Sequence, residues 1–169
     1  MKQLHIILFS ILMIISSYYN AQTFVAFKSK KYGYSFQYPS NFTIKTSKNI
    51  STDFNAVKEG NFANINMNTL PFDFANYGFD QVTKKTIEDA IKPHVSYFSI
   101  SKFTKTKISG HNTIIIYCDV TSGEFTFSQI TAFVYWPKNP LTFTCSSYKK
   151  DFNTYNNMFQ KIITSLILK

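Results

Sequence analysis

The sequence predicts an α+β fold in which an antiparallel sheet of about six or seven strands is packed by helices. Three observations lead to this prediction. Apolar and polar residues alternate in short segments along the chain, which is the period-two pattern of strands covered on one side. Residues 151–168 carry apolar side chains at spacings of three and four, which indicates a long amphipathic C-terminal helix. Aromatic residues make up 18% of the 169 residues, which supplies enough apolar surface for a core.

Residues 1–21 predict a secretory signal peptide. Lys2 supplies a positive n-region, Ile6–Ile15 is a short apolar run, and a more polar stretch ends at the small residue Ala21. The run is shorter than the about 20 residues that span a bilayer. No cysteine directly follows it, so a lipid-anchored export signal is not available. We expect cleavage after Ala21, a periplasmic or extracellular location, and a single domain over residues 22–169.

The positive charge of the chain comes entirely from lysine. All 18 basic residues are Lys, and removing Lys2 with the signal lowers the formal net charge from +9 to +8. Proteins that read nucleic acids rely on Arg for bidentate contacts to phosphate and guanine. Together with export, this composition argues against a nucleic-acid partner. The Lys excess fits an AT-rich coding bias, and an anionic partner such as a lipid surface or a polysaccharide is the alternative.

The N-terminal half predicts short strands. The expected strands are Val25–Lys28, Tyr34–Tyr38, Phe42–Ile44, 53–59 and 62–70. The last two form a hairpin around Gly60-Asn61. In its second arm Ala63, Ile65 and Met67 alternate with asparagines. One face of this hairpin is therefore expected to be apolar and the other hydrated.

The C-terminal half predicts a helix, four strands and a closing helix. Asp80 is expected to cap the first helix, which runs to about Lys92 and is ended by Pro93. The strands that follow are 97–108, 113–121, 124–136 and 141–148, of which the last three form a meander. The amphipathic helix over 151–168 is expected to pack on the sheet and close the domain.

The strand over 124–136 contains a break in its alternation. Phe125 and Phe127 are odd-numbered apolar positions, whereas Ile130, Ala132 and Val134 are even-numbered. A period of two puts both sets on one face only if one extra residue is inserted. We therefore expect a β-bulge near Ser128-Gln129.

Several local patterns carry a resemblance to a known family. The matching segments are Gly33–Pro39 with Asn41-Phe42, the turn at Gly110, Leu141–Ser146, and Phe152, Tyr155, Phe159 and Ile163–Leu166. They resemble the PsbP-like superfamily, which is named for an extrinsic subunit of photosystem II and includes a Ran-binding nuclear-transport factor. The resemblance implies a PsbP-like fold over about residues 24–168. It transfers no catalytic residue to this chain, and many exported bacterial members have no assigned role.

The two cysteines could be core residues, could be joined in a disulfide, or could include a catalytic nucleophile. Cys118 shares parity with Ile114 and Ile116, and Cys145 shares parity with Phe143, so both are expected to be buried and inert. With the predicted bulge, both face the same core. They are then separated by two strand spacings and by roughly 13 Å along the strands. Because a disulfide needs Cα atoms within about 7 Å, we expect none between Cys118 and Cys145.

The remaining candidates for chemistry are few. His94 and His111 each stand beside a turn signal and lack metal-ligand spacing. The carboxylates considered are Glu88, Asp89, Asp119 and Glu124. None of them makes a convincing acid–base pair. The sequence therefore predicts no catalytic residue, no metal site and no cofactor.

Aromatic residues crowd the segment between the hairpin and the first helix. They are Phe72, Phe74, Tyr77 and Phe79. The segment either folds back as a lid on the core or forms an interaction loop, since exposed aromatic patches mark binding surfaces. We expect at least one of Phe72, Phe74 and Tyr77 to be largely exposed.

Three functions are compatible with these features. The first is an exported, non-enzymatic binding or accessory domain that contacts a protein or a cell-envelope component. The alternative is a small-molecule or lipid carrier with an aromatic pocket between sheet and helix. An enzyme of unrecognised type is the third, and the sequence offers no catalytic constellation for it.

Overall fold

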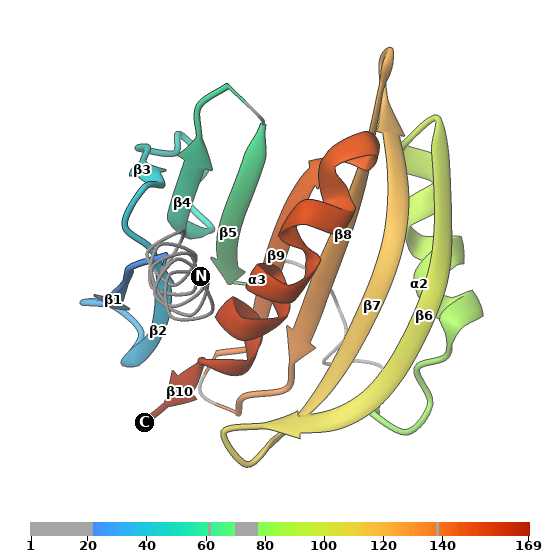
Figure 1. The fold of residues 1–169 in the computed structure, drawn as a ribbon. Coiled ribbons are helices and arrows are strands. Elements are labelled where there is room, and N and C mark those ends of the chain that lie inside the picture. The colour runs from blue at the N-terminus through green and yellow to red at the C-terminus, as the bar shows by residue number, and fades with distance from the viewer. Residues whose placement is uncertain (1–21, 61, 70–77, 138) are drawn as a thin grey trace, which may run out of the picture.

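A computed structural model describes residues 22–60, 62–69, 78–137 and 139–169 of the chain (Figure 1). Its strands form a seven-stranded antiparallel sheet in the order β3-β4-β5-β9-β8-β7-β6 and a three-stranded sheet in the order β1-β2-β10. The predicted α+β class is therefore confirmed. The predicted signal peptide, residues 1–21, lies outside the described residues.

The described elements follow the predicted order. The large sheet consists of β3 (Thr43–Ile44), β4 (Thr52–Lys58), β5 (Ala63–Thr69), β6 (Tyr97–Ile108), β7 (His111–Ser122), β8 (Phe125–Val134) and β9 (Leu141–Tyr148). The small sheet consists of β1 (Phe24–Lys28), β2 (Tyr34–Pro39) and β10 (Ile167–Leu168). The helices are α2 (Lys84–Ile91) and α3 (Phe152–Thr164), with short 3₁₀ turns η2 (Lys92–His94) and η3 (Lys149–Asp151).

Both helices differ from the prediction at one end. Thr83, and not Asp80, caps α2: its hydroxyl accepts a hydrogen bond from the backbone N–H of Thr86 at 3.1 Å. Asp80 instead lies in a turn, where its carbonyl accepts a bond from Lys105 at 2.8 Å. At the C-terminus α3 ends at Thr164, because the next residues leave the helix and pair with β2 as β10.

The β-bulge predicted near Ser128-Gln129 is wrong. The register of β8 runs without a shift against both β7 and β9. The two apolar sets simply lie on opposite faces: Ile130 and Ala132 are buried on the α3 side, and Phe127 stacks on Tyr148 on the other side. Because both faces of β8 are partly covered, no inserted residue is needed. Register shifts occur elsewhere, between Thr52 and Phe54 and between Ile100 and Lys102.

Two apolar cores lie on the two faces of the large sheet. On the first face, α3 and the small sheet pack on β4, β5, β9 and β8 (Figure 1). Its centre includes Phe36 and Phe143, whose ring centroids are 4.6 Å apart, together with Phe159 and Ile162 of α3. On the second face, Ile87 of α2 and Val82, which precedes the helix, pack against β6, β7 and the end of β8. The first core is the larger of the two and positions the strands that build the candidate site.

Candidate functional site

The second face of the sheet is closed over only part of its width. In the described part of the chain, α2 covers side chains of β6, β7 and β8, and Figure 1 shows it behind that side of the sheet. On β4, β5 and β9 the same face carries polar, half-buried side chains. They are Asn55, Asn64, Asn66, Asn68, Thr142, Thr144 and Ser146. The alternation that buries one face therefore leaves an open, polar surface on the other.

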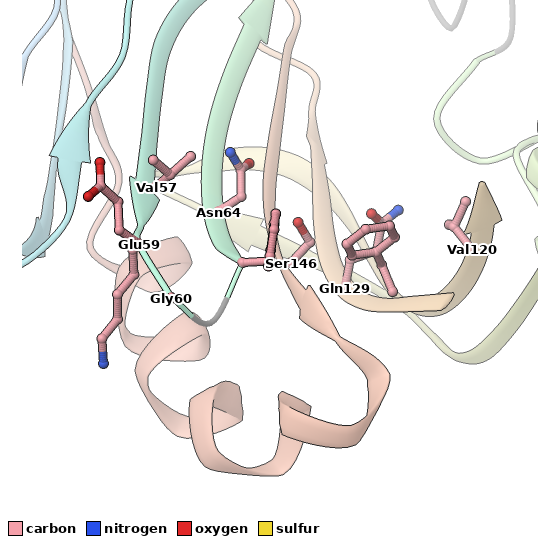
Figure 2. Close-up of a pocket in the computed structure, with 10 residues that line it drawn as sticks. Val57, Glu59, Gly60, Asn64, Val120, Gln129 and Ser146 are labelled. Carbon is pink, nitrogen blue, oxygen red and sulfur yellow. The ribbon is translucent and has the colours of Figure 1, made fainter. Parts of the chain in front are cut away.

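A cavity of about 530 Å³ opens on this surface near the β4–β5 turn. Figure 2 shows Val57, Asn64, Ser146, Gln129 and Val120 along its floor, contributed by successive strands from β4 to β7. Phe62 and Phe127 also line it. Because pairing brings Asn64 opposite Ser146 and Ser146 opposite Gln129, one row of the sheet supplies the polar part of this floor. Thr69, which borders the undescribed residues 70–77, lies at the other end of β5.

Two aromatic side chains that line the cavity, Phe62 and Phe127, belong to a cluster of four rings. Phe62, Phe125 and Phe127 each contact Tyr148, at centroid distances of 4.8, 5.5 and 5.3 Å. Phe62 is 61% exposed and Phe125 is 53% exposed, which is unusual for rings of this size. Phe62 also has a φ of 48°, a left-handed conformation that is strained for a bulky residue. These four residues are called the aromatic rim below.

Hydrogen bonds orient the amides of the floor. Asn64 receives a bond from the amide of Asn66 and donates one to the Asn55 side chain at 2.9 Å. The Gln129 amide donates to the sulfur of Cys118 at 3.4 Å. A carboxamide has two N–H donors and an acceptor oxygen, so each amide has capacity beyond these bonds. The floor therefore presents donors and acceptors in fixed positions.

A second cavity, of about 270 Å³, continues the first toward α2. The two share Gln129. The further lining is polar from the strands and apolar beside the helix: Asn49, Ser51, Asn68, Thr131, Thr142, Thr144, Ile91, Ile116 and Phe133. We call the two cavities together the groove; it runs along the strands from the β4–β5 turn to Asn68 and Ile91.

The groove carries almost no net charge. Of the described residues that line it, Lys58 and Glu59 are charged. The Lys58 ammonium lies 5.3 Å above the ring of Tyr155, a residue of α3 on the opposite side of the sheet. Glu59 pairs with Lys45 at 2.9 Å, and this hydrogen bond holds the pKa of the Glu59 carboxyl below its usual range. The floor is therefore uncharged in a protein with a formal net charge of +9.

The structure places the two cysteines on opposite faces. Both are free and buried, so the predicted absence of a disulfide is confirmed, but the predicted shared face is wrong. Cys118 pairs with Gln129 in the α2-side core, and Cys145 pairs with Ile130 in the α3-side core. Burial raises the pKa of Cys118 to about 12 and raises that of Cys145 well above its usual value. Both thiols are consequently poor nucleophiles.

The predicted histidine and carboxylate positions are not brought together. His94 is exposed in η2, and the ring of His111 lies 6.5 Å from that of Trp136. Asp119 accepts a bond from Ser128 and pairs with Lys149 at 2.7 Å. Glu88 contacts Lys92 at 3.2 Å and Lys84 at 3.8 Å. Within the described ranges, no three His, Cys, Asp or Glu residues are grouped as a metal site would require.

The predicted interaction loop is described only at its end. Phe72, Phe74 and Tyr77 lie outside the described residues. Phe79 is partly buried, with its ring 5.3 Å from Tyr135 and beneath the Lys105 ammonium. The role of this segment as an interaction loop stays a prediction.

Among residues 22–60, 62–69, 78–137 and 139–169, no helix has the length and apolar character needed to cross a membrane.

Sequence reasoning missed the residues that build the groove. The signal was present in β8, where the odd-numbered Phe125 and Phe127 indicate an apolar patch on the second face. The bulge hypothesis assigned them to the core instead. The contributions of Phe62 and Tyr148 depend on the pairing of β5, β9 and β8, which the sequence does not specify residue by residue.

The arrangement of strands and helices matches solved structures. The solution structure of cyanobacterial PsbP (CyanoP) from Synechocystis aligns over 90% of this chain and 96% of its own, with a TM-score of 0.61 at 14% identity. The chain has the PsbP-like fold. This confirms the resemblance drawn from Gly33–Pro39 and Leu141–Ser146.

Two further structures share this PsbP-like fold. LpqN of Mycobacterium tuberculosis, described as involved in cell envelope biogenesis, aligns over 88% of this chain and 91% of its own, with a TM-score of 0.58 at 8% identity. The Ran-binding protein Mog1p of Saccharomyces cerevisiae aligns over 88% and 96%, with a TM-score of 0.56 at 7% identity. At these identities the likeness is one of fold. No protein-family model and no curated protein matches the sequence.

Proposed function

We propose that this PsbP-like domain is an exported, non-enzymatic binding domain that contacts a protein or cell-envelope component through the groove. The observation that carries the proposal is the aromatic rim beside an open cavity of about 530 Å³. Exposed rings that border a concave surface mark binding sites more often than single exposed residues do. LpqN, which shares the fold, is described as involved in cell envelope biogenesis, which supports the envelope as the place to look.

The chemistry of the described residues supports binding over catalysis. The two thiols are buried with raised pKa values. Asp119 and Glu88 are held in ion pairs, and the groove presents amides and hydroxyls in place of acids and bases. Amides and hydroxyls orient ligands well, but they are poor proton-transfer groups at neutral pH.

A carrier of small molecules or lipids is the second candidate. A cavity of about 530 Å³ lies within the size range of small-molecule sites, which supports it. The space between the sheet and α3 is filled, because Phe143, Phe159 and Ile162 are fully buried. A carried ligand would therefore occupy the groove. Native mass spectrometry separates the two functions, since a carried molecule would co-purify with the protein.

Capture from an envelope extract tests the proposed function. The full chain is expressed, and the purified protein is immobilised and exposed to a detergent extract of the native envelope. Phe62→Ala is expected to reduce recovery of the captured component about tenfold, because it removes the exposed ring of the rim. Tyr97→Ala is the matched control: Tyr97 is 52% exposed on the α3 face. Equal capture by Phe62→Ala, or loss with Tyr97→Ala alone, would contradict the proposal.

Export is a separate part of the proposal. The n-region, apolar run and small residue at Ala21 support it. N-terminal sequencing of the protein recovered outside the cytoplasm is expected to begin at Gln22. A full-length protein that stays in the cytoplasm would contradict export while leaving the groove intact.

A further inference from the structure

We infer that the groove binds a neutral saccharide chain, with sugar hydroxyls on its amide floor and a sugar ring against the aromatic rim. This inference rests on the proposed function, because it names the chemistry of the envelope component. It requires three properties of the site: hydrogen-bonding groups of both polarities, exposed aromatic faces, and a lining without net charge.

The floor supplies hydrogen-bonding groups of both polarities. Carboxamides and hydroxyls each donate and accept, and a sugar hydroxyl does the same. Along the groove these groups come from three strands, β5, β8 and β9, and from the loop before β4. They are Asn49, Ser51, Asn64, Asn68, Gln129, Thr131, Thr142, Thr144 and Ser146. Because the amide of Asn64 is fixed by Asn55 and Asn66, part of this array is already oriented before a ligand arrives.

The rim supplies an apolar face beside the polar floor. The ring of Phe62 is 61% exposed and is held against Tyr148 at 4.8 Å. Aromatic faces carry negative partial charge, and the C–H bonds on one face of a sugar ring are weakly positive. A ligand that is apolar on its ring face and polar at its edges therefore matches this juxtaposition of rings and amides.

The uncharged lining distinguishes a neutral sugar from other occupants. An acidic polysaccharide or an anionic membrane would be expected to meet lysines, yet the Lys58 ammonium lies over Tyr155 across the sheet. An acyl chain favours an apolar channel, because unpaired polar groups lose hydration when a chain covers them. The larger cavity has a mainly apolar surface, but the second cavity adds asparagine, serine and threonine side chains that an acyl chain along the whole groove would cover. Both alternatives are therefore less compatible with the groove than a neutral sugar chain.

The shape of the groove indicates a chain longer than one sugar. The cavities of about 530 and 270 Å³ meet at Gln129 and lie one after the other along the strands, from Asn64 to Asn68 on β5 and from Ser146 to Thr142 on β9. The larger cavity alone falls within the range for drug-sized ligands. Gln129, at the junction, is accordingly expected to contact the middle of the bound chain.

Titration with neutral oligosaccharides tests the inference. Maltohexaose, cellohexaose, xylohexaose, mannohexaose and chitohexaose are added to the isotope-labelled, purified protein, and backbone amide signals are followed by NMR. At least one is expected to shift signals around Asn64, Gln129 and Ser146. Gln129→Ala and Phe62→Ala are each expected to weaken binding about tenfold, because each removes a contact of the order of 1.4 kcal/mol. Gln160→Ala and Tyr97→Ala are matched controls, and Ser146→Ala replaces Gln129→Ala if the latter does not fold.

Two results would overturn the inference. The first is that none of the five neutral hexasaccharides shifts the groove signals. The second is that the signals respond only to oligogalacturonate or to phosphatidylglycerol vesicles, or that the shifts lie outside the groove. If either result is found while envelope capture still depends on Phe62, the proposed function stands and the saccharide inference alone fails.

Discussion

The two faces of the seven-stranded sheet differ in what covers them. On the face packed by α3, Phe143, Phe159 and Ile162 are fully buried, and the small sheet extends the same core. On the other face, among the residues that the structure describes, α2 covers the β6–β8 side, and the remainder presents amides, hydroxyls and an aromatic rim. Successive side chains of one strand point alternately to these two faces. The first face therefore holds the larger buried core, whereas the open half of the second has exposed groups available for recognition.

Cysteine accessibility gives the largest expected effect. Burial raises the pKa of Cys118 to about 12, so at pH 8 its thiolate is roughly 1000-fold scarcer than that of a thiol with a pKa of 9. Iodoacetamide is expected to leave both native thiols unlabelled under conditions that label an added Ser40→Cys at once. In denaturing guanidinium both are expected to react. Fast labelling in the native state, or a bridged species two mass units lighter, would show that the cysteines do not occupy separate cores.

Core truncation compares the two faces along a single strand. Phe143→Ala is expected to lower the free energy of unfolding by about 3–5 kcal/mol, because it leaves a cavity beneath α3. Ser146→Ala, on the groove side of the same strand, is expected to change it by less than about 0.5 kcal/mol. Urea denaturation measures both. Similar losses for the two variants would mean that the faces do not divide stability and recognition.

The smaller core beneath α2 is expected to contribute less to the free energy of unfolding than the core beneath α3. Ile87→Ala is expected to cost about 2–3 kcal/mol of unfolding free energy, since Ile87 is fully buried in a shorter helix. Asp89→Ala, which removes only an exposed ion pair with Lys85, is expected to keep the wild-type midpoint. A loss with Ile87→Ala as large as that with Phe143→Ala would show that α2 contributes as much to stability as α3.

The buried Tyr34–Asp53 contact in the α3-side core is expected to make stability depend on pH above about pH 10. Tyr34 is buried and donates to the Asp53 carboxylate at 2.6 Å, and burial followed by this bond raises its pKa well above 10. The contribution of this contact to the free energy of unfolding is fully present below the unfolded pKa of about 10. It is lost as the pH rises further, by about 1.4 kcal/mol per pH unit. Tyr34→Phe is expected to remove this extra slope in urea midpoints measured from pH 9 to 11. An unchanged slope would contradict the buried contact, and Tyr97→Phe is the exposed control.

Phe62 gives the smallest expected effect on stability. Phe62→Gly loses the ring contact with Tyr148, worth about 0.5–1.5 kcal/mol, but relieves a positive φ that costs a bulky residue about 1–2 kcal/mol. The unfolding free energy is therefore expected to change by less than about 1 kcal/mol, as measured by urea denaturation. A loss of several kcal/mol would identify Phe62 as a residue of the fold and not of recognition.

The sequence predicts the fold better than the site, for a physical reason. Strands such as Tyr97–Ile108 and Leu141–Tyr148 were predicted with the observed bounds, because alternation and turn residues are local signals. The N-cap at Thr83 and the C-terminal end of α3 are not predicted correctly, because several neighbouring residues compete to begin or end a helix. Both faces of β8 are partly covered. Phe125 and Phe127 on its second face therefore break the expected alternation and wrongly predict a bulge.

The groove depends on register between strands that are distant in sequence. Asn64 and Gln129 are brought to one row only by pairing through Ser146. A local pattern of asparagines predicts a hydrated face but does not reveal which strand lies beside it. The aromatic rim likewise combines Phe62 with Phe125 and Tyr148, which no local pattern connects.

Photo-crosslinking tests most directly whether the groove is the binding surface. p-Benzoyl-phenylalanine is placed at position 62 in one variant and at position 97 in another, so that each replaces an exposed aromatic residue on one face of the sheet. After illumination in the native envelope, the variant at position 62 is expected to form a crosslinked adduct that the variant at position 97 does not form. Adducts from position 97 alone, or equal adducts from both positions, would contradict the assignment of recognition to the open half of the sheet.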